Sequence, residues 1–152
     1  MVERGQPGLS LTVQYALDRS GLPAASDFRR WAKAALMTNV SATLRLVDAE
    51  EGQALNRDYR GKIHATNVLS FAYGMEAEDG ALTGDIVLCA PVVEREAREQ
   101  GKTLTAHYAH LTVHGLLHLQ GYDHEKKVQA VTMESLESFI MQRLGFPDPY
   151  SP

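Results

Sequence analysis

The segment T-A-H-Y-A-H-L-T-V-H-G-L-L-H-L-Q-G, residues 105–121, decides the fold predicted for this chain. Alanine, leucine and valine make up most of its residues other than histidine, and Gly121 ends the pattern, as glycine commonly does just beyond a helix. Four histidines share one face that spans about 80° of helical arc: His107, His110, His114 and His118. We therefore predict a long helix over residues 105–120 that is buried on most sides, with one polar stripe facing a cleft or a ligand.

Shorter periodic segments surround this helix. Apolar alternation and short apolar runs predict four strands, at residues 9–17, 42–47, 67–72 and 85–90. Helical spacing predicts four further helices, at residues 28–37, 48–59, 91–101 and 125–144. The predicted fold class is α+β: a small mixed sheet of about four strands packed with about five helices. We expect residues 1–152 to form a single domain.

Two of the predicted helices carry an apolar face that indicates how they pack. In the first helix the face consists of Phe28, Trp31, Ala35 and Leu36. In the last helix the predicted face consists of Val128, Val131, Leu136, Phe139, Ile140 and Leu144. Both faces are expected to lie against the core.

The composition excludes several classes of protein. With 44% hydrophobic and 22% charged residues among 152, the chain is neither disordered nor fibrous. No apolar run approaches the length of a membrane span, and the first residues, M-V-E-R-G-Q-P-G, lack the pattern of a signal peptide. The single cysteine, Cys89, excludes an internal disulfide, which favours a cytoplasmic location. The net charge of −4 argues mildly against nucleic-acid binding, although a local basic patch can still bind RNA.

The segment H-G-L-L-H-L-Q-G-Y-D-H, residues 114–124, has the spacing of a metal site at the end of the central helix. His114 and His118 point within about 40° of each other on a helix, and the turn after Gly121 can bring His124 back beside them. Three imidazole nitrogens and one open position are typical of catalytic zinc. Asp123 is either a partner that orients a ligand or a turn residue.

The ligand set also indicates the substrate. Three neutral imidazoles leave the full charge of a divalent metal uncancelled, which favours an anionic substrate such as a phosphodiester. Gly115 stands where an H-E-x-x-H metallopeptidase carries its glutamate base. His107 and His110 are weaker candidates for ligands, and they are expected to orient neighbours or to contact substrate.

A basic segment, N-R-D-Y-R-G-K-I-H, occupies residues 56–64. Arg57, Arg60 and Lys62 outweigh its one acid. Arg60, at a predicted helix end, either reaches a phosphate with its planar guanidinium or is an ordinary solvated cation near a helix C-terminus.

Four blocks of sequence resemble the YbeY family of bacterial metal-dependent endoribonucleases. They are Y-R-G-K at 59–62, T-N-V-L-S-F at 66–71, G-D-I-V-L-C at 84–89 and the histidine segment at 114–124. The resemblance implies that His114, His118 and His124 hold one zinc ion and that Arg60 is the basic residue needed for RNA cleavage. Residues 63–65 depart from the family's more polar stretch, and His64 is a candidate for a basic side chain there.

The resemblance also implies a biological role. Members cleave single-stranded RNA, mature the 3′ end of small-subunit ribosomal RNA and act in ribosome quality control. The implied partners are ribosomal RNA, the small subunit and its assembly factors.

Two other functions stay open on the sequence. One is a zinc-dependent hydrolase of another bond, such as a peptide, against which Gly115 weighs. The other is a non-catalytic ribosome-assembly factor with a structural zinc, although structural sites usually close with four protein ligands.

Overall fold

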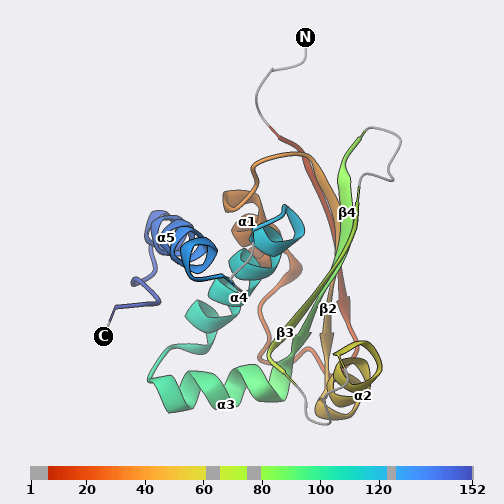
Figure 1. Ribbon diagram of the computed structural model, residues 1–152. Helices are drawn as coiled ribbons and strands as arrows, with labels where there is room; N and C mark the ends of the chain where they lie inside the picture. The colour runs from red at the N-terminus through yellow and green to blue at the C-terminus, as the bar shows by residue number, and fades with distance from the viewer. Residues whose placement is uncertain (1–6, 61–65, 75–79, 123–125, 152) are drawn as a thin grey trace.

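The computed structural model describes residues 7–60, 66–74, 80–122 and 126–151 of the chain, and for Tyr59 and Arg60 only the backbone. These residues form one four-stranded sheet and five helices (Figure 1). The strands are β1 (Leu9–Tyr15), β2 (Val40–Val47), β3 (Val68–Gly74) and β4 (Leu82–Cys89). The helices are α1 (Ala25–Ala34), α2 (Ala49–Arg60), α3 (Ala90–Gln100), α4 (Leu104–Leu119) and α5 (Lys127–Arg143).

The sheet is mixed, with strand order β1-β2-β4-β3. β1, β2 and β4 run parallel, whereas β3 pairs antiparallel with β4 at one edge. Successive residues of a strand point to opposite faces, and the sheet accordingly separates two apolar clusters. Leu46 belongs to the larger cluster, and its neighbour Val47 belongs to the smaller one with Leu55 of α2 packed against it. The predicted α+β fold with a small mixed sheet is confirmed.

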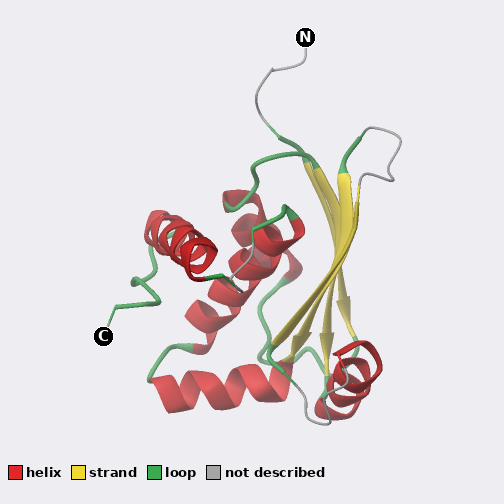
Figure 2. Cartoon of the chain, in the orientation of Figure 1, coloured by secondary structure: helices red, strands yellow, loops and turns green. Residues whose placement is uncertain are grey.

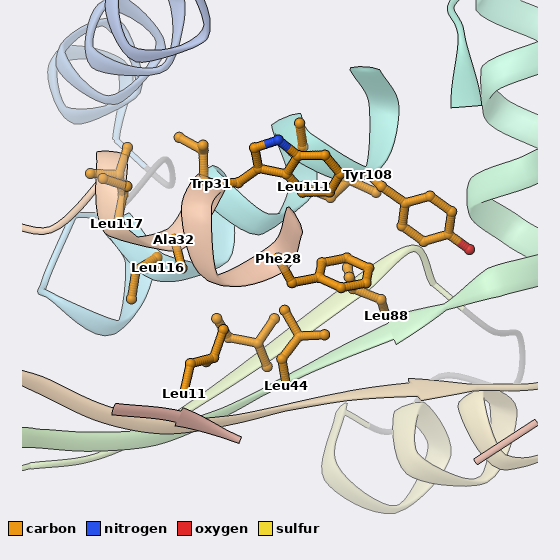
Figure 3. Packing of buried hydrophobic residues seen from close by; sticks show 14 of the residues in the cluster. Leu11, Phe28, Trp31, Ala32, Leu44, Leu88, Tyr108, Leu111, Leu116 and Leu117 are labelled. Carbon is orange, nitrogen blue, oxygen red and sulfur yellow. The ribbon is translucent and has the colours of Figure 1, made fainter. Parts of the chain in front are cut away.

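The larger cluster lies between the sheet and α1 and α4, on the side opposite α2 (Figure 2). Phe28 and Trp31 of α1 are fully buried there and meet edge to face, with ring centroids 5.4 Å apart. Tyr108 of α4 packs edge-on against Phe28 at 5.9 Å (Figure 3). The predicted inner face of the first helix is therefore confirmed for its two aromatic residues.

Two glycines allow α4 to approach the sheet. A Cβ atom at Gly115 would come within 3.0 Å of the Ile86 side chain on β4. A Cβ atom at Gly84 would come within 2.5 Å of Leu119 and 2.7 Å of the Phe71 carbonyl oxygen. The close contact fixes which face of α4 is turned to the core, and hence which face carries its accessible side chains.

The prediction for the last helix is partly wrong. Val128, Val131 and Phe139 expose 79%, 61% and 57% of their surface, so they do not lie on the inner face. The residues of α5 that are buried are Met133, Glu137, Ile140 and Met141. The helix is rotated relative to the prediction because a buried acid, which hydrophobic periodicity does not select, occupies the inner face.

The predicted fourth strand was too short at its start. β4 begins at Leu82 rather than Asp85, because Leu82, Thr83 and Gly84 continue the parallel pairing with β2. It ends at Cys89, which is buried and is followed directly by α3. No helix in the described part of the chain has both the length and the apolar character needed to cross a membrane.

Candidate metal centre and its carboxylate network

The accessible stripe of α4 consists of histidines. From His107 to Leu119 every side chain is buried except three that are partly accessible: His110, His114 and His118. They follow one another at four-residue spacing, so they lie on one face. The predicted burial of this helix on its other sides, with a polar stripe left accessible, is confirmed.

Gln120 anchors the end of α4 that carries His118. Its Oε1 accepts hydrogen bonds from the backbone amides of Met37 at 2.6 Å and Thr38 at 3.1 Å. Its Nε2 donates to the carbonyls of Ala35 at 2.9 Å and Leu116 at 3.0 Å. This one side chain therefore satisfies four backbone groups and ties the end of α4 to the segment between α1 and β2.

The chain turns directly after this anchor. Gly121 has φ +102°, a conformation that favours glycine, and the Tyr122 amide donates to the Leu117 carbonyl at 3.2 Å. The predicted helix end at residues 120–121 is confirmed. The predicted third ligand, His124, and Asp123 lie outside the described residues, so the predicted metal-ligand set stays a prediction.

The histidine stripe has a partner on α5 that sequence reasoning missed. Glu137, only 1% exposed, contacts two imidazoles: its Oε1 lies 2.5 Å from His110 Nε2 and its Oε2 lies 3.2 Å from His114 Nδ1. The hydroxyl of Tyr150 donates to Oε1 at 2.8 Å. Burial raises the pKa of Glu137, but the hydrogen bonds and charges of the two histidines outweigh this effect and lower the pKa to about 2. The carboxylate is therefore ionised and accepts all three hydrogen bonds.

These contacts determine which nitrogen of His114 faces a metal. A carboxylate acceptor at Nδ1 requires that Nδ1 carry the proton, so the lone pair of the ring resides on Nε2. An imidazole that gives one N–H to a carboxylate and ligates through the other nitrogen is the usual arrangement at metal sites. His114 therefore fits the donor set of a divalent zinc site, with Nε2 as the ligating atom.

A second carboxylate contacts His107, which lies on α4 one turn before the accessible histidine stripe. Glu96 of α3 lies 2.9 Å from His107 Nε2 and accepts a hydrogen bond from the Asn67 side chain at 2.9 Å. Burial lowers the pKa of His107, although Glu96 opposes the shift. Within the described part of the chain, the Nδ1 atoms of His107 and His110 have no hydrogen-bond partner. A neutral imidazole suits His107, because a second N–H on its ring would be buried and unsatisfied.

The other predicted site residue, Arg60, is the last residue of α2. Its side chain and residues 61–65, which include His64, lie outside what the structure describes. No group of three metal-ligating side chains converges among the described residues, a set that excludes His124. The structure thus places His114 and His118 on one face of α4, and the metal-ligand roles of these two histidines and of His124, like the role of Arg60, stay predictions.

Comparison with known proteins assigns a family. The family described as Endoribonuclease YbeY matches residues 23–145. An endoribonuclease YbeY from Methylobacillus flagellatus is 61% identical over 145 residues, which cover 95% of each chain. One from Nitrosomonas europaea is 59% identical, over 93% of this chain and 85% of its own. The solution structure of a Thermotoga maritima protein superposes with a TM-score of 0.55 at 25% identity, covering 93% of this chain and 99% of its own.

Proposed function

The chain belongs to the endoribonuclease YbeY family, and on this premise we propose that it cleaves RNA at a zinc ion held by three imidazoles: His114, His118 and His124. Membership confirms the predicted family and the predicted enzyme class, a hydrolase that acts on RNA. The metal, its ligands and the role of Arg60 are our proposals.

The observation that best supports a metal is the contact between His114 Nδ1 and Glu137 Oε2, at 3.2 Å. It directs the lone pair of the ring to Nε2, on the accessible stripe that His118 shares. A buried carboxylate behind a partly exposed imidazole is what a metal ligand requires to keep its orientation and tautomer.

Each residue has a distinct task in the proposed reaction. A bound zinc ion would supply positive charge that polarises a phosphoryl oxygen or lowers the pKa of water. His114 and His118 would hold that ion from one helix face, and the turn at Gly121 would direct His124 to it. Arg60, at the end of α2, would offset the negative charge that develops on the phosphoryl oxygens.

The packing of Gly115 disfavours the peptidase alternative. A Cβ atom at this position would meet Ile86 at 3.0 Å, so a glutamate here would place its carboxylate against the sheet and away from the histidine stripe. An H-E-x-x-H mechanism needs that carboxylate beside the metal. Residue 115 therefore cannot supply a general base beside the proposed metal. The site suits hydrolysis of a phosphodiester better than hydrolysis of a peptide.

We extend the proposal to the biological role that the family resemblance implies. The substrate would be single-stranded ribosomal RNA, with maturation of the small-subunit RNA 3′ end and ribosome quality control as the processes. The small subunit and its assembly factors would be the partners, and the setting would be cytoplasmic, in keeping with the free, buried Cys89. Residues 1–152 would act as a single domain.

The test is RNA cleavage by the purified chain with and without a metal chelator, followed by addition of zinc. We expect cleavage to stop with chelator and to return with zinc. Arg60→Glu should lose cleavage yet keep its metal, whereas Arg57→Glu, on the same helix, should cleave. RNA that stays intact while the metal-loaded protein still binds ribosomes would instead favour the non-catalytic assembly factor.

A further inference from the structure

We propose that Glu137 is a positioning residue for the metal ligand His114, and that the C-terminal segment holds Glu137 in place through Tyr150. This inference rests on the proposed metal site, which it deepens by naming the residues behind the ligand. Neither Glu137 nor Tyr150 belongs to the sequence blocks that carry the family resemblance.

The first step is that burial and hydrogen bonds fix the side chain of Glu137 in one position. Its two oxygens receive contacts from His110, His114 and Tyr150 at 2.5, 3.2 and 2.8 Å, and the residue is 1% exposed. A buried carboxylate with three donors keeps one rotamer, because any other would leave a charge and its donors unsatisfied. Oε2 is therefore a fixed acceptor for His114.

The second step is what a fixed acceptor does to an imidazole. Neutral histidine exchanges its proton between the two ring nitrogens, and the ring also flips about its Cβ–Cγ bond. An acceptor at Nδ1 selects one tautomer and one ring orientation, so that Nε2 carries the lone pair before metal arrives. His118 shares the accessible face, and ordering one ligand of the pair lowers the entropy that binding must remove.

The third step connects this acceptor to the end of the chain. Asp148 accepts hydrogen bonds from the Ser138 hydroxyl of α5 at 2.7 Å and from the Tyr150 backbone amide at 3.0 Å. These bonds fasten the segment after α5 back onto that helix, one residue away from Glu137. The Tyr150 ring then packs edge-on against His110, with centroids 5.5 Å apart, while its hydroxyl reaches Glu137.

The experiment compares Glu137→Gln with Glu96→Gln, which changes the other carboxylate that contacts a histidine of α4. Zinc affinity is measured by competition with a chromogenic chelator, and the ring tautomers of the metal-free proteins are read from histidine ¹⁵N shifts. We expect Glu137→Gln to weaken zinc binding about 10- to 100-fold and Glu96→Gln to change it by less than about threefold. Tyr150→Phe should give a smaller loss than Glu137→Gln.

In the wild-type protein without metal, His114 should carry its proton on Nδ1, and Glu137→Gln should shift it toward the Nε2-protonated form. Equal zinc affinities of wild type and Glu137→Gln, or a wild-type His114 protonated on Nε2, would overturn the positioning role while leaving the proposed endoribonuclease intact. A wild-type chain that binds no zinc would overturn both. If Glu137→Gln fails to fold, the tautomer of wild-type His114 and the affinity of Tyr150→Phe decide the question.

Discussion

Two carboxylates contact histidines of α4, and the two regions differ in what the histidines face. Near the start of the helix, Glu96 of α3 meets His107, whose ring is 3% exposed. Near the end, Glu137 of α5 meets His110 and His114, and the His114 side chain is 22% exposed. The same chemical pair therefore joins two helices in one region and orients an accessible imidazole in the other.

The difference shows that a histidine–carboxylate contact alone does not identify a metal ligand. The exposure of the histidine side chain separates His107, at 3%, from His114, at 22%. His107 has its remaining nitrogen enclosed by protein, so the contact with Glu96 contributes to packing and stability. His114 keeps surface on the stripe that ends at His118, and we propose that its contact with Glu137 prepares Nε2 of the ring to bind a metal.

Removing one histidine from each region should produce the largest contrast. We expect His114→Ala to retain less than about one-tenth of the wild-type zinc, because a ligand is lost. His107→Ala should bind zinc at close to wild-type stoichiometry. Elemental analysis of the two proteins after dialysis measures the difference, and equal zinc contents would erase the distinction drawn between the regions.

The two carboxylates should also differ in their effect on stability. Glu137→Ala leaves three donors without an acceptor in a buried setting, and we expect it to lower the free energy of unfolding by about 3 to 5 kcal/mol. Glu96, which is 24% exposed, retains access to water, so Glu96→Ala should cost about 1 to 2 kcal/mol. Urea unfolding in the presence of chelator gives both values, and a larger loss for Glu96→Ala would reverse the assignment.

The ends of α4 extend the comparison. Gln120→Ala removes a side chain that satisfies four backbone groups, and we expect a loss of about 2 to 3 kcal/mol. Thr103 caps the other end by accepting from the Ala106 amide at 3.1 Å, so Thr103→Ala should cost about 1 kcal/mol. Thermal unfolding ranks the two variants. Zinc affinity should fall only in Gln120→Ala, whose end of the helix carries His118.

The smallest expected effect is on how the stability of the fold depends on pH. Burial lowers the pKa of His107, while Glu96 raises it and Lys102 and His110 lower it further. The unfolded chain therefore binds more protons than the folded one between the folded pKa and about 6.5, so stability is lost as the pH falls below about 6.5. His107→Gln, which keeps a donor for Glu96 but does not titrate, should flatten this part of the stability profile by about 1 kcal/mol or less. Identical profiles of the two proteins between pH 7.5 and 5.5 would argue against the shift.

Much of this arrangement could be predicted from the sequence, and the reason lies in α4 itself. Its apolar residues surround a narrow histidine stripe and Gly121 ends the helix, so composition and spacing agree on where it starts, stops and faces. The two metal ligands that we propose on it, His114 and His118, follow from the same periodicity.

The partners of the stripe could not be predicted, because they come from distant parts of the chain. Glu137 occupies the inner face of α5, where a pattern search expects an apolar residue, and the exposed Val128 and Phe139 favoured the wrong face. A buried acid between Met133 and Ile140 is the one local signal, and it gains meaning only once His110 and His114 are opposite it. Gln120 was likewise unremarkable in sequence, since its four partners are backbone groups, three of them more than 80 residues away.

The most direct test of the metal centre is a crystal structure of the chain grown with zinc and measured at the zinc absorption edge. We predict a single anomalous peak about 2.0 to 2.1 Å from His114 Nε2, with His118 and His124 as the other imidazole ligands and Glu137 still bound to His114 Nδ1. A peak on His107 or His110 instead, or a His114 ring turned so that Nδ1 meets the metal, would contradict the account.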